Sequence, residues 1–454
     1  MISRRSRYLA TAAMATAALL VTGGAAAASG RSSPTRVTRG FDTHKRVTIT
    51  IADGWGDTPS VAAAFAGVVH NFERKYPNVR VNLETEGSNA YNEAINLRAA
   101  SNNPPDVFML STAGYGPGFY DLAKAGDLEP LDAYAKAYGW YKRFSPTALE
   151  VFRLNRKTGQ WGSGALYGLP EQNTMIGVFY NKKILHAIGF SSPPTTFAQF
   201  ETTLALAKEK GYTPIAATKD AYVHDEMGLW DAFSSSEQPI NNWVYGKSGT
   251  FASSANLRAV ETLLTWQKDG YLQAGSEGLG YGNAVGALTG GSALYFFAGP
   301  WLDGAVQSSL GPDAGFMQLP SVSKRSPVGG GPSSPLVISS KSKHLAVDAA
   351  FLNFFNSTAE SNYLVQHGWG PPGATVNPSV ARTLPVTAEV LAILRRVEAP
   401  GGAGTTPYIN WASPAVNNDI YSGLESVLAN QMTPAQYLAQ IQNDWVQFKA
   451  QRRS

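Results

Sequence analysis

Acidic side chains are the first candidates for catalysis in this chain, because a pair of carboxyl groups can hydrolyse a glycosidic bond. The carboxylates that could supply such a pair are Glu171, Asp225, Glu226 and Asp231. The sequence gives no distance between their carboxyl groups, and no motif singles out two of them. A solvated or hydrogen-bonding role is therefore the favoured interpretation of these acids, with a glycosidase pair as the alternative.

Other catalytic and cofactor motifs are missing from the sequence. The six histidines are scattered without metal-ligand spacing, and there is no cysteine, so thiolate metal sites and cysteine nucleophiles are excluded. The glycines at 280, 282 and 286 only approximate a dinucleotide fingerprint, because their spacing is one residue too long and no strand precedes them. We expect no catalytic residues, no metal and no cofactor.

The composition indicates a chain that buries large cores. Of its 454 residues, 44% are hydrophobic and 15% are charged, a length typical of two to three domain-sized units. The formal charge is +4, but three arginines lie within the first seven residues, which leaves +1 for the remainder. This balance gives no electrostatic reason to expect a nucleic-acid partner.

The N-terminal segment is predicted to be a secretory signal peptide covering residues 1–28. A basic start is followed by an apolar run at 9–21, which is too short to span a bilayer, and then by small residues suited to cleavage. The pair Arg4-Arg5 leaves the twin-arginine route open beside general secretion. Residues 29–43 are polar and are predicted to be a tether.

Strand and helix patterns alternate through the first half of the chain. Period-two hydrophobic patterns predict strands at 47–51 and 79–83, and residues 106–110 (DVFML) are predicted to be a third strand. Helical patterns at 59–75 and 91–100 separate them. Strands that alternate with helices through short connections form parallel sheets. In such open sheets, ligands bind beyond the carboxyl ends of the strands.

A second α/β block follows this first one. It is predicted as strands at 175–180, 213–217 and 293–297, with helices around 197–207 and 257–267 and a capping box at Thr196. The segment 327–335 is rich in glycine, proline and serine, which favours a crossing between domains. Beyond it, a mainly helical pattern runs to the C-terminus.

Several short motifs occur in an order that points to a known family. They are Phe72 to Val79 (FERKYPNV), Ala99 to Leu110 (AASNNPPDVFML), Gly168-Leu169-Pro170, Phe179 to Lys183 (FYNKK), Pro193 to Thr196 (PPTT), Phe296 to Trp301 (FFAGPW) and Ile338 to Lys343 (ISSKSK). With these motifs the chain resembles the extracellular solute-binding proteins of ATP-binding-cassette sugar importers, the group that includes the maltose-binding protein.

The resemblance implies a two-lobed periplasmic-binding-protein fold of the α/β class. Each lobe is expected to be a mainly parallel sheet flanked by helices, and several crossings form the hinge. The expected first lobe comprises residues 44–170 and 328–375, and the second comprises 171–327 and 376–454. Crossings are expected near 171–174 and 327–335.

The resemblance also implies the function. We expect a secreted, monomeric receptor that captures a mono- or oligosaccharide and delivers it to permease subunits of an importer, and that is not an enzyme. A secreted glycosidase is the alternative, and a peptide or other solute as ligand stays open because fold does not fix ligand. Many Gram-positive members carry a lipid-modified cysteine after the leader, and this chain has none.

Tryptophans are the first candidates for ligand contacts, because sugars present apolar C–H faces on which aromatic rings stack. Trp301 follows a predicted buried strand and belongs to a Gly-Pro-Trp turn. In the family, the tryptophan of this turn stacks on the ligand. Trp55 lies past the first strand, where such loops contact ligands. Trp230 matches a ligand-facing stretch of the family, with a core position as the equal alternative.

Four further residues complete the candidate ligand-binding set. Asn173, at the first expected crossing, is the preferred hydrogen-bonding side chain, and Thr112 follows the third strand as a minor contact. Trp369 and Trp411 match later segments that reach the cleft in the family. For each of these two tryptophans, a packing role is an equally good interpretation.

The leader predicts the N-terminus of the mature protein. Because the small residues at 23–28 offer cleavage positions, exported protein is expected to begin near Ser29 and to carry no fatty acid. N-terminal sequencing and intact-mass measurement of exported protein test this expectation. A chain that begins at Met1, or that is acylated, contradicts it.

Overall fold

The computed structural model describes residues 40–42, 44–110, 115–144, 146–323, 325–370, 373 and 375–453. From Val37 onward the chain forms one compact unit. The predicted signal peptide and nearly all of the predicted tether lie outside the described residues. Within the described ranges, no helix combines the length and the apolar character needed to cross a membrane.

The first sheet has the strand order β13-β12-β3-β1-β2, and β7 pairs with β12. Its strands are β1 (Val47–Asp53), β2 (Val79–Thr85), β3 (Val107–Met109), β7 (Gly168–Met175), β12 (Val328–Ile338) and β13 (Thr405–Thr406). The strand β1 runs parallel to both β2 and β3, so the parallel arrangement predicted from the alternating pattern is confirmed. Ile49 and Ile51 are buried, as their period-two spacing predicts.

The second sheet has the order β11-β8-β10-β9. Its strands are β8 (Gly177–Asn181), β9 (Thr213–Ala216), β10 (Ala293–Ala298) and β11 (Ala314–Met317). Only β9 and β10 pair in parallel, whereas β8 is antiparallel to both of its neighbours. The sheet is therefore mixed and not mainly parallel. The reason is that β8 follows β7 after a single residue. The direction of β8 is therefore set by the crossing strand β7, whereas a strand that follows a helix would return parallel to its neighbour.

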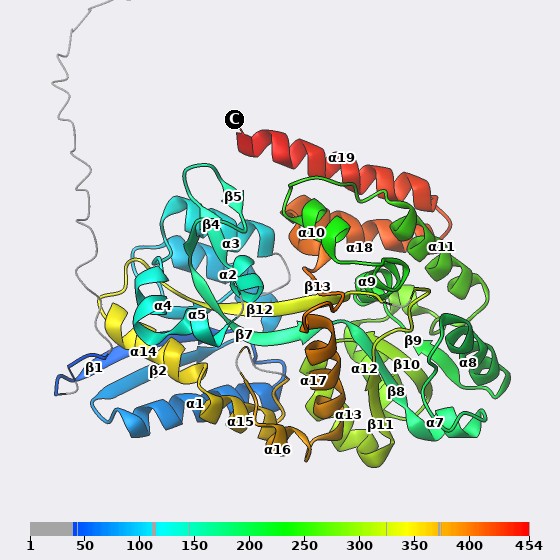
Figure 1. Ribbon diagram of the computed structural model, residues 1–454, viewed down its shortest axis with the longest axis horizontal. Coiled ribbons are helices and arrows are strands. Elements are labelled where there is room, and N and C mark those ends of the chain that lie inside the picture. Colours follow the sequence, from blue (N-terminus) through cyan, green and yellow to red (C-terminus); the bar gives the residue numbers. More distant parts are fainter. Residues whose placement is uncertain are drawn as a thin grey trace, which may run out of the picture. The chain divides into compact units, whose positions relative to one another are not determined.

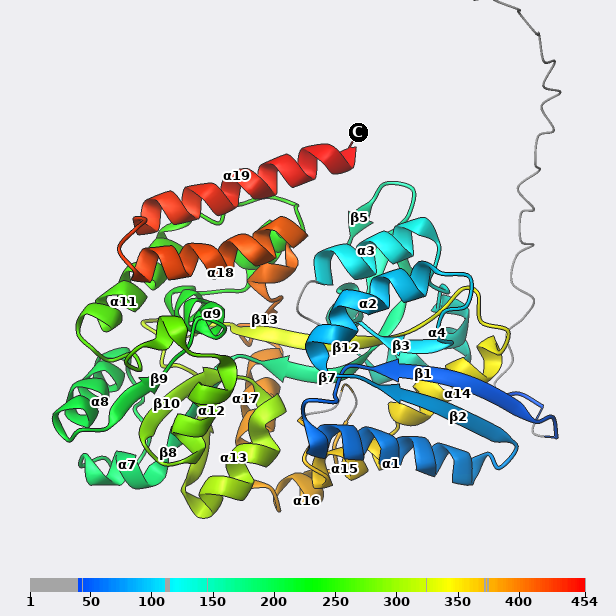
Figure 2. The same ribbon diagram turned by 180° about the vertical axis from the view of Figure 1, so that it is seen from behind.

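The two strands β7 and β12 are the crossings that the sequence predicts near 171–174 and 327–335. They pair with each other in antiparallel register, from Gly330 opposite Met175 to Val337 opposite Gly168. Figures 1 and 2 show both strands running from one group of elements to the other. Gly330 has φ +134°, and a Cβ there would lie 2.5 Å from the carbonyl oxygen of Thr174, so glycine is needed at this close approach.

We call the first sheet with its helices the first lobe, and the second sheet with its helices the second lobe. The first lobe has helices α1 (Pro59–Lys75), α2 (Ser88–Ala100), α3 (Tyr115–Ala125), α4 (Asp132–Tyr138), α5 (Trp140–Arg143), α6 (Pro146–Glu150), α14 (Leu345–Phe355) and α15 (Thr358–Gln366), and a small sheet of β4 (Arg153–Asn155), β5 (Gln160–Trp161) and β6 (Ala165–Leu166). Helix α16 (Pro378–Ala381) contacts both α15 and α17. The exact lobe boundaries stay a prediction.

The second lobe contains the remaining helices. They are α7 (Lys182–Ala187), α8 (Phe197–Glu209), α9 (Tyr222–Phe233), α10 (Gln238–Val244), α11 (Ser254–Lys268), α12 (Tyr281–Thr289), α13 (Asp303–Leu310), α17 (Pro385–Glu398), α18 (Pro414–Leu428) and α19 (Pro434–Arg453), with short 3-10 turns η1 (Ser276–Gly278), η2 (Pro300–Leu302), η3 (Gly311–Asp313) and η4 (Ile409–Trp411). At the start of α8, Thr196 Oγ1 accepts from the Gln199 backbone N–H, and Gln199 Oε1 accepts from Thr195. The predicted capping box is thus formed with one difference: the Gln199 side chain accepts from the backbone N–H of Thr195 and not from that of Thr196.

Helix α9 carries a buried acid into the core of the second lobe. Glu226 is fully buried, and its Oε2 accepts a hydrogen bond of 2.7 Å from the hydroxyl of Tyr437 on α19. Burial raises the pKa of Glu226 to about 7, against the smaller opposing effect of the bond from Tyr437. The folded protein therefore keeps a proton that the unfolded chain releases near pH 4.5.

This retained proton predicts a pH dependence of stability. The contribution of Glu226 to the free energy of unfolding is full below about pH 4.5 and is lost as the pH rises to about 7, with a slope of up to about 1.4 kcal/mol per pH unit. Replacing Glu226 with Gln removes this part of the slope. Urea unfolding between pH 5 and 7 measures it, with E201Q on the exposed face of α8 as the control. An unchanged slope in E226Q contradicts the assignment.

Candidate functional site

A cavity of about 240 Å³ lies where the carboxyl ends of β1 and β3 meet the two crossing strands and the second lobe. Residues from both lobes and from the crossings surround it. They are Gly54, Trp55, Asp57, Thr58, Met109, Gln172, Thr174, His224, Trp301, Ser333, Ser334, Tyr408, Asn410, Trp411 and Tyr421. The position agrees with the rule that ligands of open α/β sheets bind beyond the carboxyl ends of the strands.

A larger surface groove of about 660 Å³ lies elsewhere on the second lobe, between residues 318–326 and 396–403. Its two arginines are already engaged: Arg325 donates to the carbonyl oxygen of Gly401, and Arg396 donates to Oε1 of Gln318, each at 2.6 Å. Among its described lining residues there is no aromatic side chain. We therefore take the smaller cavity, which has aromatic walls, as the candidate site.

Trp55 forms one wall of the cavity and is held at three points. Its backbone N–H donates to Oδ1 of Asp53 at 3.0 Å, and its indole Nε1 donates to Oε2 of Glu171 at 3.2 Å. Its ring packs edge-on against Trp369, with 5.4 Å between the centroids. The loop after β1 therefore presents this indole in one fixed orientation.

Trp301 forms a second wall, from the turn η2 that follows the buried strand β10. Its Nε1 donates to the hydroxyl of Tyr281 at 2.9 Å, and the His224 ring lies 5.5 Å from it between centroids. Trp55 and Trp301 each follow a strand of a different sheet. The cavity thus has one indole from each lobe.

Three polar atoms on cavity-lining side chains are buried and have no hydrogen-bond partner in the described structure: Nε2 of Gln172, Nδ1 of His224 and Oδ1 of Asn410. Burial lowers the pKa of His224 to about 4, and its ring bonds to the backbone of Phe297, so the imidazole is neutral and Nδ1 is an acceptor. A buried polar group without a partner costs about 1–3 kcal/mol. A ligand that supplies both donors and acceptors removes this cost.

The charge of the lining favours an uncharged ligand. Asp57 is the only acidic residue among the described lining residues, and none of them is a lysine or arginine to pair with an anion. The acids Glu171, Asp225, Glu226 and Asp231 do not line the cavity. Across the described ranges, no group of three or more histidine or acidic side chains is arranged to hold a metal ion.

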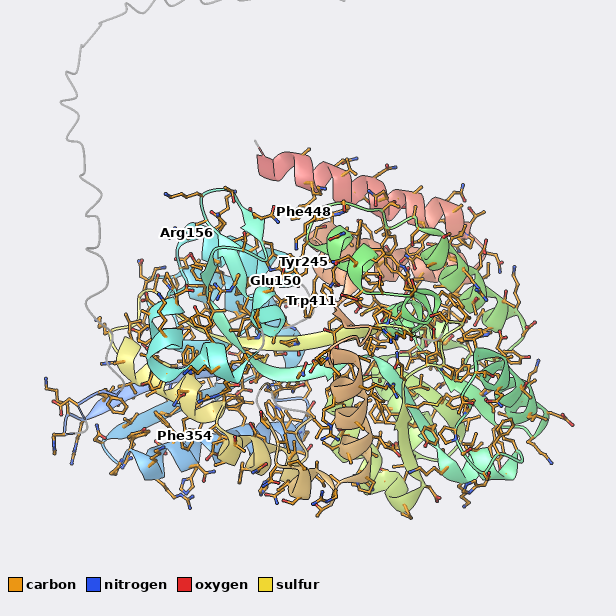
Figure 3. All side chains as sticks on the ribbon, in the orientation of Figure 1. Glu150, Arg156, Tyr245, Phe354, Trp411 and Phe448 are labelled. Atoms are coloured by element: carbon orange, nitrogen blue, oxygen red, sulfur yellow. The ribbon has the colours of Figure 1, made fainter. Side chains whose placement is uncertain are left out.

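The structure places three of the predicted ligand residues around this cavity. Trp55, Trp301 and Trp411 all line it. Trp411, labelled in Figure 3, comes from η4. The ring of Tyr408 packs against it, with 4.9 Å between the centroids. Their contact with a ligand stays a prediction. Thr112 lies outside the described residues, although Met109 at the end of the same strand lines the cavity.

The other three predicted residues lie away from the cavity lining. Trp230 is 2% exposed and packs against Trp243 and Phe251 in the second lobe, so it has the packing position that was its alternative. Trp369 is fully buried behind Trp55. The Asn173 side chain donates to Oε1 of Glu398 at 3.3 Å and does not line the cavity.

The polar side chains at the cavity were missed because sequence reasoning did not assign a strand at 171–174. In β7, side chains alternate between the two faces, so Gln172 and Thr174 line the cavity while Asn173 points away. With a strand assigned at 171–174, the alternation of side chains would have indicated Gln172 and Thr174, and not Asn173, as the candidate ligand contacts. Asn410 had a signal, since it directly precedes the candidate Trp411.

A family model described as bacterial extracellular solute-binding protein matches residues 55–361. Among curated proteins, the chain is similar to the melibiose/raffinose/stachyose-binding protein MelE of Bacillus subtilis, with 30% identity over 169 residues. The aligned part covers 37% of this chain and 35% of that relative, so the chain spans about a third of the length of the protein it matches.

Solved structures match over nearly the whole described chain. A chitin oligosaccharide binding protein aligns with a TM-score of 0.75 and 22% identity, covering 89% of this chain and 99% of the other. The solute-binding protein RafE in complex with raffinose aligns with a TM-score of 0.67 and 19% identity, covering 90% and 100%. These matches show the two-lobed periplasmic-binding-protein fold.

The unpartnered amide of Gln172 predicts an unusual response to substitution. Replacing Gln172 with Leu removes a buried donor that has no partner, so the stability of the ligand-free protein should stay equal or rise. Gln442 is the matched control, because its Oε1 accepts from both Trp243 Nε1 and the Phe251 N–H. Q442L should therefore lose about 1–3 kcal/mol in urea unfolding. Equal losses in the two variants would show that Gln172 is satisfied without ligand.

Proposed function

Because the chain belongs to the bacterial extracellular solute-binding protein family, we propose that it is a receptor that binds a neutral carbohydrate in the cavity between its lobes. It acts outside the cytoplasmic membrane and delivers this ligand to the permease subunits of an ATP-binding-cassette importer. The receptor works as a monomer and performs no reaction on the ligand.

The observation that carries this proposal is the pairing of two indole walls with partnerless neutral polar atoms. The apolar C–H face of a sugar ring fits against an aromatic ring, and Trp55 and Trp301 offer one such surface from each lobe. A hydroxyl both donates and accepts, so a ring of hydroxyls satisfies Gln172, His224 and Asn410 together. An anion finds no lysine or arginine among the described lining residues, and Asp57 is an acid in the same lining.

The relatives support the same ligand class. The names of the similar proteins give melibiose, raffinose, stachyose and chitin oligosaccharides as ligands, and all of these are uncharged saccharides. The cavity has a volume of about 240 Å³. A cavity of this size encloses part of an oligosaccharide, and further units extend outward between the lobes.

A glycosidase is disfavoured by the distribution of acids. Both hydrolytic mechanisms use two carboxyl groups that flank the glycosidic bond, at about 5–10 Å from each other. Asp57 is the only acid among the described residues that line the cavity. The described lining therefore offers no second carboxyl group of the kind that hydrolysis needs.

Ligand capture is expected to involve closure of the two lobes about the paired crossings. The strands β7 and β12 connect the lobes, and both contribute residues to the cavity. A sugar that contacts both lobes favours the closed arrangement by its differential affinity for that state. The strands about which the lobes close are thus also strands that line the ligand cavity.

A thermal-shift screen with a product assay tests the function. Melibiose, raffinose, stachyose and chitin oligosaccharides are added separately, with glucuronic acid as the charged control. A bound saccharide at about 100 times its Kd adds roughly 2.7 kcal/mol of stability. Stabilisation without release of reducing sugar supports the receptor. No stabilisation by any neutral saccharide, or sustained release of reducing sugar, contradicts it.

Trp301 provides the sharpest single-residue test of the site. Replacing Trp301 with Ala removes one indole wall and should weaken saccharide binding by about 1–3 kcal/mol, while W301F should lose less because it keeps a ring. Isothermal titration measures the affinity. Phe448→Ala on α19 is the control, since it removes a half-buried aromatic side chain away from the cavity (Figure 3). Parental affinity in W301A would contradict the assignment of this wall.

A further inference from the structure

Glu171 is a buried acid in the crossing strand β7 that the proposed ligand contacts do not use. It is fully buried and does not line the cavity, yet it lies one residue before Gln172, which does. Its Oε2 accepts the hydrogen bond from Nε1 of Trp55, a residue 116 positions earlier in the chain. The side chain of Glu171 thus connects the crossing strand β7 with the Trp55 indole of the first lobe.

The backbone of Glu171 makes a second long-range connection. Its carbonyl oxygen accepts from the backbone N–H of Gly373 at 3.3 Å, in the later segment that returns from the first lobe. Nearby, Trp369 packs edge-on against the Trp55 ring from the same segment. Glu171 therefore connects the Trp55 indole with the segment that contains Gly373.

We propose that Glu171 is a positioning residue, which fixes the Trp55 indole from the hinge strand so that this wall of the cavity is oriented before ligand arrives. This inference rests on the proposed function, since it assumes that Trp55 is a surface on which ligand binds. Preorganisation of this kind raises affinity because the side chain loses no further freedom on binding. Asp53 restrains the backbone of the same residue, so the orientation is fixed at both ends of Trp55.

The protonation of Glu171 fits this positioning role. Burial raises the pKa of Glu171 well above its ordinary value, and the negative charge of nearby Asp53 raises it further. Burial therefore favours the uncharged form of this carboxyl group. An amide has the same shape and no charge and still accepts from an indole N–H, so Glu171→Gln is a conservative variant, whereas Glu171→Leu removes the acceptor.

The first test needs no ligand and follows the Trp55 indole itself. In ¹H–¹⁵N spectra of the full chain, each of the ten tryptophans gives one indole N–H signal, and W55F identifies the signal of Trp55. We expect E171L to shift this signal upfield and to speed its exchange with solvent, and E171Q to keep it close to the parental position. A Trp55 signal that is unchanged in E171L overturns the proposal, whatever the protein binds.

Asn353→Leu is the matched control for this measurement. Asn353 Oδ1 accepts from Nε1 of Trp140, a fully buried indole in the first lobe that does not line the cavity. N353L should shift the Trp140 signal and leave the Trp55 signal in place. N353L should also leave saccharide affinity unchanged. This result would show that an effect of E171L on affinity comes from the Trp55–Glu171 hydrogen bond and not from the loss of a buried indole hydrogen bond in general.

The second test joins the indole to binding in a double-mutant cycle, with raffinose as the probe in isothermal titration. In the parent, E171L should weaken raffinose binding by about two- to tenfold, the size expected for one neutral hydrogen bond. In the W55F background, which has no indole N–H, E171L should have no further effect. An equal loss in both backgrounds overturns the proposal, because Glu171 then does not act through Trp55.

The two tests keep the proposal apart from the proposed function. If raffinose and the other neutral saccharides do not bind the parent, the function is wrong, while the indole spectra still report whether Glu171 orients Trp55. If E171L does not fold, the comparison of E171Q with W55F takes its place. Parental raffinose affinity in E171Q with a weaker W55F supports positioning, whereas a loss in E171Q as large as that in W55F contradicts it.

Discussion

The pairing of β7 with β12 is the constraint on which the rest of the structure depends. These strands connect the lobes, and their ladder extends from Gly330 opposite Met175 into the first sheet. Because β8 follows β7 directly, the pairing also sets the direction of the second sheet. Gln172 and Thr174 on one strand and Ser333 and Ser334 on the other bring polar side chains to the cavity. The hinge and the floor of the site are therefore the same two strands.

The site is built from groups that a stable core would avoid. Unpartnered Gln172, His224 and Asn410 carry a desolvation cost in the ligand-free protein, and the buried acid Glu171 adds another. Each of these groups lies at or directly behind the cavity. Buried amide oxygens without a partner also occur away from the cavity, at Asn241, Asn256 and Asn356, whereas Gln442 is satisfied by Trp243 and Phe251. What distinguishes the three groups at the cavity is that they line one space, where a single ligand can reach all of them.

The sequence predicted most of the fold and part of the site. Period-two and helical patterns located β1, β2, α1 and α11, and short apolar runs located β9 and β10, which are buried along nearly their whole length. The glycine- and proline-rich segment 327–335 was predicted as a crossing but not as a strand, since its ladder with β7 is made by a partner far away in sequence. The same missing strand hid Gln172. Trp230 and Trp369 could not be assigned from sequence, because an indole in a core and an indole at a cavity have the same local pattern.

The most direct measurement is a crystal structure of the protein with the neutral saccharide that stabilises it most. The account predicts a sugar ring between the indoles of Trp55 and Trp301, with its hydroxyls bonded to Gln172, His224 and Asn410. A saccharide bound instead in the groove beside Arg325 and Arg396, or in the cavity with those three polar atoms still unpartnered, would contradict the account.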